Sequence, residues 1–380
     1  MWKVLICLVL MTRSQCANIL GVFPLNLKSH YIIYQSVMKE LATRGHNVTV
    51  INPFPMTKAR QNFTDIDIKE CFNIPGSFAL NDVYIHQTIL YYDLVITEIF
   101  HGDVTLGFVD KFQAQHVAFC PSSHVSLGSR SCGFNTPVPL VPGVIEIAGL
   151  QINKEESLPE DIKKFIDESE HGVIYFCMGS LFKMETFPEP KRIAFLRAFS
   201  KLPERIIWKW DGDLQGKTDQ IFVSKWMPQR DILAHPNVKL FIAHGGALGL
   251  NEAIYEGVPV LGIPMYADQT LNLRLLQANG AAEILEYSDI NNDTVFTKIT
   301  QVLHSKYAMN MKKLSKIYKD RPMSAMDTAI YWIEYVIRHE GAHHLRTAAV
   351  NLPLYQYLLL DVVAFLITIM GSADHCFKKN

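Results

Sequence analysis

This 380-residue chain has few charged residues, and the two signs balance. Charged side chains make up 19% of it, with 36 basic against 37 acidic residues and a formal net charge of −1. A nucleic-acid-binding protein normally carries a basic stripe, so no nucleic-acid partner is expected. The seven cysteines include no CxxC pair, which argues against a zinc ribbon or a redox motif. Hydrophobic residues reach 49%, enough to bury a large core in about two domains.

Long apolar runs occur only near the two ends. Residues 1–17 combine an early lysine, an apolar core and small residues before a plausible cleavage point, which predicts a secretory signal peptide; a buried first strand is the alternative. Residues 352–370 are almost wholly apolar, with tyrosines at one edge and Lys378 and Lys379 beyond, which is typical of a membrane anchor. This stretch is barely long enough to span a bilayer and contains Asp361, so a hydrophobic docking helix is the alternative.

Strand and helix patterns alternate along both halves of the chain. In the first half, a helix from about Ser29 to Gly45 separates two apolar runs, which makes a βαβ unit. The strands predicted there are Asn18–Phe23, His46–Ile51, Asp93–Thr97 and His116–Cys120. The strands predicted in the second half are Gly172–Cys177, Arg205–Lys209, Lys239–Ala243, Val258–Ile263 and Ala281–Leu285. Prolines and polar residues over 136–159 indicate a linker, so we predict two α/β domains, 18–150 and 151–345, facing a ligand cleft.

The second half concentrates residues suited to a nucleotide. His244-Gly245-Gly246 follows a strand and opens a helix, where bare glycines let a diphosphate approach backbone N–H groups; a simple tight turn is the alternative. Trp226 could stack on a base or belong to the core, and Glu252 could accept hydrogen bonds from ribose hydroxyls. Asp268 and Gln269 suit sugar hydroxyls but equally a helix N-cap.

Taken in order and spacing, these residues resemble the signature of the UDP-glycosyltransferases. The matching stretch runs from Phe222-Val through Trp226, Pro228-Gln229, His235-Pro236, His244-Gly245-Gly246, Glu252, Gly257-Val-Pro259 and Asp268-Gln269 to Gly280. Gly172–Ser180 and Gly341–Arg346 are similar to the insect members. The resemblance implies a GT-B fold, two Rossmann-like domains facing a cleft, followed by a C-terminal apolar transmembrane-like helix.

The resemblance also implies a role for each residue of the motif. Trp226 would stack on uracil, Gln229 would meet the base or ribose, and Glu252 would hold the ribose diol. His244, Gly245, Gly246 and Ser180 would face the diphosphate, while Asp268 and Gln269 would hold the transferred sugar. Where family members commonly carry Asn or Ser beside the diphosphate, this chain has Leu248 and Gly249, which should weaken donor binding. No metal and no cofactor is expected, since the UDP-sugar is a co-substrate.

The family's general base is a histidine after the first strand, and His30 matches that place. At a helix N-terminus the dipole disfavours the protonated imidazolium, which leaves His30 able to accept a proton; a plain helix cap is the alternative. An orienting carboxylate is also needed, and both Glu98 and Asp103 follow a predicted strand. Of the two, the similarity of the loop 101–108 to the insect type favours Asp103.

The implied reaction is inverting transfer of a hexosyl group to a hydroxyl of a small lipophilic acceptor, as in detoxification or hormone conjugation. UDP-glucose is favoured over UDP-glucuronate by the insect resemblance. The implied location is the endoplasmic reticulum membrane with a luminal body, or a secreted or luminal soluble protein if the anchor fails. Homo- or hetero-oligomers are left open.

The first half is short for this family, particularly around 73–91 and 120–128. A second hypothesis is therefore a truncated, catalytically weak paralogue that binds the UDP-sugar or a partner subunit.

Overall fold

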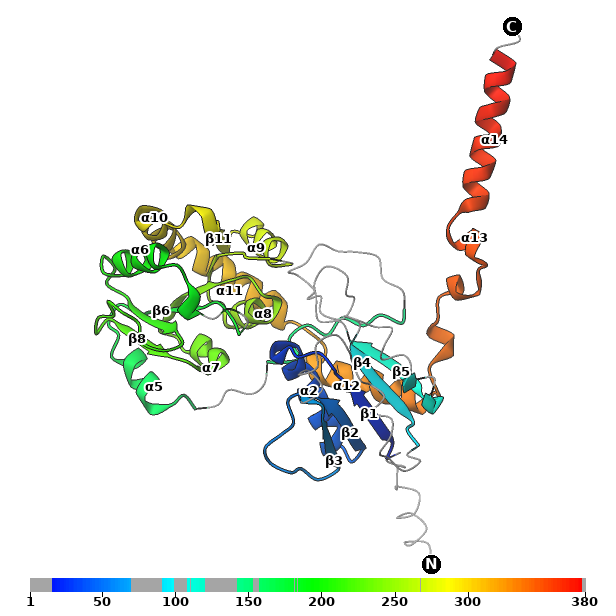
Figure 1. The fold of residues 1–380 in the computed structure, drawn as a ribbon, viewed down its shortest axis with the longest axis horizontal. Coiled ribbons are helices and arrows are strands. Elements are labelled where there is room, and N and C mark those ends of the chain that lie inside the picture. The colour runs from blue at the N-terminus through cyan, green and yellow to red at the C-terminus, as the bar shows by residue number, and fades with distance from the viewer. Residues whose placement is uncertain are drawn as a thin grey trace, which may run out of the picture.

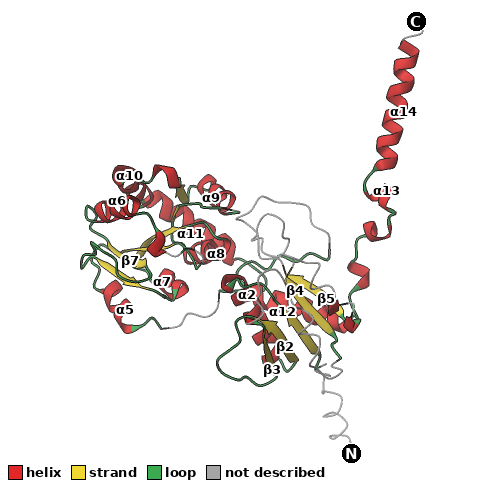
Figure 2. Cartoon of the chain, viewed as in Figure 1, coloured by secondary structure: helices red, strands yellow, loops and turns green. Residues whose placement is uncertain are grey.

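Two parallel sheets organise this computed structural model, which describes residues 16–69, 91–98, 108–109, 111–119, 142–152, 157–180, 182, 184–266 and 268–377. Figure 1 shows each sheet with its own helices, and Figure 2 shows the same arrangement by secondary structure. Both sheets follow the α/β pattern predicted from the alternating strands and helices. The predicted signal peptide lies outside the described residues up to position 15, as do Asp103 and most of the two short stretches 73–91 and 120–128.

The first sheet has the strand order β3-β2-β1-β4-β5, and all its neighbours are parallel. Its strands are β1 (Asn18–Val22), β2 (Asn47–Asn52), β3 (Phe63–Asp67), β4 (Leu94–Glu98) and β5 (Gln115–Phe119). Helix α2 (Lys28–Thr43) connects β1 to β2, and Gly45 follows it with φ +96°, the left-handed conformation that glycine allows after a helix.

The second sheet has the order β11-β10-β9-β6-β7-β8 and is also parallel. Its strands are β6 (Val173–Cys177), β7 (Arg205–Lys209), β8 (Ile221–Ser224), β9 (Val238–Ala243), β10 (Val260–Gly262) and β11 (Ala282–Ile284). The helices of this part of the chain are α5 (Glu160–Asp167), α6 (Glu189–Phe199), α7 (Gln229–Ala234), α8 (Ala247–Glu256), α9 (Gln269–Ala278), α10 (Asn292–Val302) and α11 (Ser305–Lys319).

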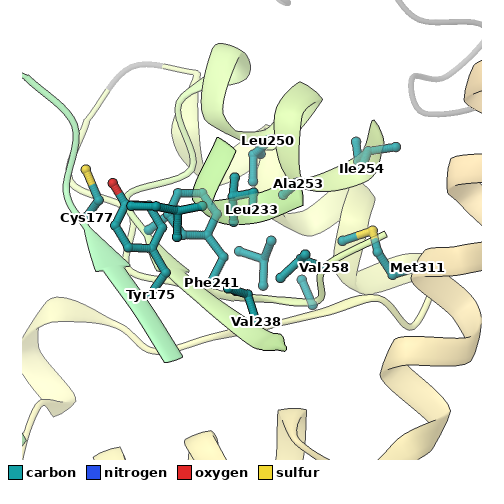
Figure 3. Packing of buried hydrophobic residues seen from close by; sticks show 14 of the residues in the cluster. Tyr175, Cys177, Leu233, Val238, Phe241, Leu250, Ala253, Ile254, Val258 and Met311 are labelled. Atoms are coloured by element: carbon teal, nitrogen blue, oxygen red, sulfur yellow. The ribbon is translucent and has the colours of Figure 1, made fainter. Parts of the chain in front are cut away.

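The core on one side of the second sheet determines where α8 lies. Leu250, Ala253 and Ile254, three and four residues apart, point from α8 into this core, as Figure 3 shows. Tyr175 and Phe241 stack there with ring centroids 5.3 Å apart. The buried side of α8 is therefore fixed by packing, which leaves its first turn and its other faces for other contacts.

Helix α12 (Ala325–Arg338) returns to the first sheet although it follows the whole second sheet in sequence. Its buried residues Ala329, Ile330 and Ile333 belong to the same cluster as Ile19, Val37 and Leu94. Arg44 pairs with Asp327 at 3.1 Å on the surface of this contact. The range 151–345 that we predicted for the second domain thus contains a helix that packs on the first.

The chain ends in helices α13 (Leu354–Tyr357) and α14 (Leu360–Phe377), the second of which projects away from both sheets in Figure 1. Among the described helices, none combines the length and apolarity that a membrane crossing requires. The spanning helix predicted over 352–370 is therefore not found. The apolar stretch is broken at Leu359, whose φ is +55°, and Asp361 lies in the first turn of α14.

Candidate functional site

His30 and Glu98 meet at the carboxyl end of the first sheet. β1 and β4 are parallel neighbours, so the loop after β1 that leads into α2 lies beside the last residue of β4. The His30 Nδ1 atom lies 2.6 Å from Glu98 Oε1, and the Glu98 side chain is only 2% exposed. A carboxylate that accepts from Nδ1–H leaves Nε2 as the basic nitrogen. The pair thus has the geometry of an oriented general base.

This contact bears on the two carboxylates that the sequence left open. Glu98, the less favoured of them, is the carboxylate hydrogen-bonded to His30. Asp103, which we favoured, lies outside the described residues, so its position relative to His30 stays a prediction.

His244 follows β9 and lies between two glycines. A Cβ on Gly179 would come within 2.7 Å of its ring, and one on Gly246 within 2.5 Å. Burial lowers the pKa of His244 to about 4, against the opposing effect of Asp268. Its Nδ1 atom is buried with no hydrogen-bond partner in the described part of the chain. The low pKa keeps the imidazole neutral at pH 7, and the two glycines leave room for its ring.

The glycines after His244 form the turn into α8. Gly245 has φ +90°, and a Cβ there would lie 2.7 Å from Leu273 Cδ1. Gly246 is the N-cap of α8, so the first N–H groups of this ten-residue helix point toward the turn. Helix N–H groups next to unsubstituted glycine backbone are suited to an anion such as a diphosphate.

Three further candidates come from β8 and the helices after it. Trp226 follows β8, Gln229 is the first residue of α7, and Glu252 lies on α8. Trp226 is 65% exposed, so the alternative of a core tryptophan is excluded. Gln229 Nε2 donates to Glu252 Oε2 at 2.7 Å, and burial raises the pKa of Glu252 to about 7. A Cβ on Gly249 would lie 3.1 Å from Gln229 Nε2, so glycine at this position leaves room for that amide. An exposed aromatic ring suits stacking on a base, and an amide paired with a carboxyl group suits ribose hydroxyls.

Asp268 and Gln269 begin helix α9. Gln269 Oε1 accepts from the backbone N–H groups of Met265 and Tyr266, at 2.8 and 3.2 Å, and so holds the preceding loop. Asn272 Nδ2 donates both to Asp268 Oδ2 at 2.9 Å and to Gly245 O at 3.1 Å. The fully buried Asn272 thereby links the predicted sugar side of the site to the predicted diphosphate side.

One residue near this site, Lys209, and one contact, that of Leu248 with the first domain, were not predicted from the sequence. Lys209 ends β7, and its Nζ donates to Gly179 O at 2.9 Å, which places a cation beside the loop that carries the exposed Ser180. Only the strand order reveals it, because β7 is next to β6. Leu248 packs against the core cluster of the first domain, a contact that no local motif could indicate.

All the second-domain candidates follow the carboxyl ends of parallel strands. Ser180 comes after β6, Trp226 after β8, His244 after β9 and Asp268 after β10. In a doubly wound sheet these ends lie along one edge, where ligands bind. The arrangement provides N–H groups that can donate to a diphosphate, side-chain oxygens that can accept from sugar hydroxyls, and an exposed aromatic face for a base.

The sequence and the fold were compared with known proteins. The family model described as "UDP-glucoronosyl and UDP-glucosyl transferase" matches residues 79–378. "UDP-glycosyltransferase UGT5" of Dactylopius coccus is 41% identical over an alignment of 471 positions that covers 93% of this chain and 90% of the relative. Human "UDP-glucuronosyltransferase 2B7" is 37% identical over 255 residues, which is 66% of this chain and 47% of the relative.

Solved structures of low sequence identity share the fold. A UDP-glucose: anthocyanidin 3-O-glucosyltransferase in complex with UDP superposes with a TM-score of 0.66 at 15% identity, covering 86% of this chain and all of that one. Arabidopsis thaliana UGT89C1 complexed with UDP-L-rhamnose gives 0.67 at 16%, with coverages of 85% and 100%. These matches confirm the GT-B fold with two Rossmann-like domains. With the family model matching most of its length, the chain belongs to the UDP-glycosyltransferases, enzymes that transfer a sugar from a UDP-sugar to an acceptor.

Proposed function

We propose that this enzyme transfers a hexosyl group from a UDP-sugar to a hydroxyl of a small lipophilic acceptor, with inversion at the anomeric carbon. The observation that carries the proposal is the contact of His30 Nδ1 with the buried Glu98 carboxylate at 2.6 Å. A histidine oriented in this way can take a proton from a hydroxyl through Nε2. The carboxylate stabilises the positive imidazolium as it forms.

The proposed step balances as a single displacement. The acceptor O–H proton passes to His30 Nε2 while the acceptor oxygen forms a bond to the anomeric carbon. The bond from that carbon to the diphosphate oxygen breaks, and its electron pair leaves with UDP. Attack from the face opposite the leaving group inverts the configuration, as in inverting glycosidases.

In the second domain, each residue of the predicted UDP-sugar site has a proposed role. Trp226 would stack on uracil, while Gln229 and Glu252 would bind the base or ribose. The N–H groups after Gly245 and Gly246, with His244 and Ser180, would bind the diphosphate, and Asp268 and Gln269 would bind the sugar. We propose that helix N–H groups and the Lys209 cation balance the leaving charge, so no metal is needed.

UDP-glucose is the proposed donor in preference to UDP-glucuronate. Support comes from insect relatives, one of which, 33% identical over 94% of this chain, is named "UDP-glucosyltransferase 2" of Dactylopius coccus. We further propose that the body of the protein lies in the lumen of the secretory pathway, and this rests on the pattern of residues 1–17 alone.

One observation favours the second candidate, a UDP-sugar-binding paralogue with weak or no turnover. The alignment with the 41% identical relative spans 471 positions, more than the 380 residues of this chain. The relative therefore has segments for which this chain has no residues. If these segments line the acceptor pocket, donor binding would survive without efficient transfer.

The test is a UDP-release assay with UDP-glucose or UDP-glucuronate and a panel of phenols, flavonoids and ecdysteroids, with and without EDTA. We expect release with UDP-glucose, unaffected by EDTA, and a β-linked product from the α-linked donor by proton NMR. An α-linked product would refute the inverting mechanism. UDP binding without turnover on any acceptor would instead support the second candidate.

A further inference from the structure

Helix α8 begins at the proposed diphosphate site. It is attached to residues 147–152, which belong to the segment between the two sheets and are called the connecting segment below. Gln151 Nε2 donates to Leu248 O at 3.2 Å, and the Gln151 side chain is buried. The bond joins this connecting segment to the first turn of the helix. Gly246, the N-cap of α8, is only two residues away from Leu248 in the chain.

A second attachment lies one turn further along α8. Tyr318 Oη donates to Asn251 Oδ1 at 3.2 Å, and both side chains are buried. The Tyr318 hydroxyl also lies against Gly149, since a Cβ there would come within 2.6 Å of it. Tyr318 is thus in contact with both α8 and the connecting segment. Arg321, three residues later in the chain, donates to Ala148 O at 2.9 Å.

The connecting segment is anchored in both cores. Ile147 and Leu150 belong to the cluster of the first domain, and Ile152 packs against the cluster of the second. Leu248 itself extends from α8 onto the first-domain cluster, which also contains residues of α2. A shift of α8 would therefore disturb contacts that hold the two domains together.

The two attachments differ in the part of α8 that they hold. Gln151 bonds to the backbone carbonyl of Leu248, whereas Tyr318 bonds to the side chain of Asn251, which lies about 100° around the helix from Glu252. Glu252 is hydrogen-bonded to Gln229, on another side of the helix. Both attachments hold the backbone position of α8 from the side of the connecting segment and α11.

We propose that Gln151 and Tyr318 are positioning residues for UDP-sugar binding, because they hold α8 against the segment between the domains. The proposal rests on the proposed function, since it presumes that α8 binds the diphosphate and ribose of the donor. By reciprocity, a donor that fixes α8 also fixes the connecting segment. The 147–152 segment should therefore become better protected when UDP binds.

The test measures the Kd of UDP by titration for the wild type, Gln151→Leu and Tyr318→Phe. Both variants should bind UDP roughly 2- to 10-fold more weakly, the effect of losing one buried hydrogen bond. The matched control is Tyr307→Phe, which removes a 2.6 Å hydrogen bond to Glu283 from the same helix α11 without touching the connecting segment. Tyr307→Phe should lower the thermal stability but leave the Kd of UDP unchanged.

Hydrogen exchange of the wild type gives a second measurement that needs no variant. UDP should slow the exchange of the Ile152 amide, which donates to Gly149 O at 2.9 Å. The inference is overturned if the wild type binds UDP but both variants share its Kd, or if UDP leaves exchange over 147–152 unchanged. Absence of UDP binding by the wild type would overturn the proposed function itself, and the inference with it.

Discussion

At the scale of single residues, the environment of each polar group determines what it can do. The Glu98 side chain is buried in contact with the His30 ring, whereas the partly buried Glu252 accepts a hydrogen bond from the neutral amide of Gln229. The first arrangement orients His30, the proposed base. The second raises the pKa of a carboxyl group that is expected to hold a ribose.

The first prediction concerns Glu98→Gln. The amide cannot stabilise an imidazolium as a carboxylate does, so kcat should fall roughly 10²- to 10⁴-fold. Steady-state kinetics with saturating donor measures this. The Kd of UDP should stay at the wild-type value, because Glu98 belongs to the first domain; a kcat within twofold of the wild type would argue against the pair.

The second prediction concerns pH and Glu252. Its pKa of about 7 in the folded chain lies above the ordinary value of 4.5, so the folded state holds its proton more tightly than the unfolded state. The protonated Glu252 carboxyl group therefore contributes fully to the free energy of unfolding below pH 4.5, and this contribution is lost as the pH rises to about 7. Glu252→Gln removes this loss.

Chemical denaturation at pH 5 and pH 8 measures the effect. The stability of Glu252→Gln relative to the wild type should increase between these two values, because only the wild type must ionise a buried carboxyl group. The same difference at both pH values would show that the Glu252 carboxyl titrates normally in the folded protein.

The second-domain site residues were predicted from the motif in chain order, and their roles stay predictions. Sequence reasoning favoured Asp103 over Glu98 on the similarity of a loop, because the distances of the two carboxylates from His30 depend on strand pairing. The contact with Glu98 follows from β1 lying beside β4. Lys209 was missed for the same reason, since its relation to Gly179 arises only when β6 and β7 pair.

At the scale of elements, the turn between β9 and α8 is the most constrained part of the site. Gly245 has a positive φ and no space for a Cβ, which would meet both Leu273 Cδ1 at 2.7 Å and Gln269 O at 3.0 Å. The turn therefore depends on α9 as much as on its own sequence.

The third prediction is that Gly245→Ala lowers the free energy of unfolding by roughly 2–4 kcal/mol, from backbone strain together with overpacking. Gly212→Ala is the matched control, because Gly212 has φ +88° with nothing within 4 Å of an added Cβ. The free energy of unfolding of the control variant should fall only by the contribution of backbone strain, about 1 kcal/mol. Equal losses in the two variants would show that the contact with α9 does not matter.

Most strands were predicted from sequence to within a few residues, because apolar β-branched runs bounded by glycine and proline are unambiguous. β3 was not predicted. It is an edge strand, and its sequence Phe-Thr-Asp-Ile-Asp contains only two apolar residues, three positions apart, which gives no period-2 pattern to recognise. The helix break at Leu359, where φ is positive, also has no signal in the sequence, because the residues on both sides are apolar. It divides the predicted spanning helix into α13 and α14.

At the scale of the whole molecule, the last part of the chain completes the first domain. α12 contributes Ala329, Ile330 and Ile333 to a core otherwise built from the beginning of the sequence and the connecting segment. The spacing of these residues could indicate an amphipathic helix, but no sequence pattern states which of two sheets a helix covers.

The fourth prediction is that Ile330→Ala destabilises the first domain by roughly 2–5 kcal/mol, the usual effect of emptying a fully buried site. Hydrogen exchange should show lost protection at β1 and β2, far away in sequence. Tyr331→Ala, at an exposed neighbouring position of the same helix, is the control and should have little effect. Lost protection confined to α12 itself would contradict this role.

The central claim is that His30 is the base of a UDP-sugar transferase whose donor site is in the other domain. It is tested most directly by measuring UDP release by the wild type and by His30→Ala with the same acceptor, while UDP binding is followed by quenching of tryptophan fluorescence. The account predicts turnover by the wild type, turnover reduced roughly 10²- to 10⁴-fold in the variant, and the same UDP affinity in both. Turnover by His30→Ala at the wild-type rate would contradict it.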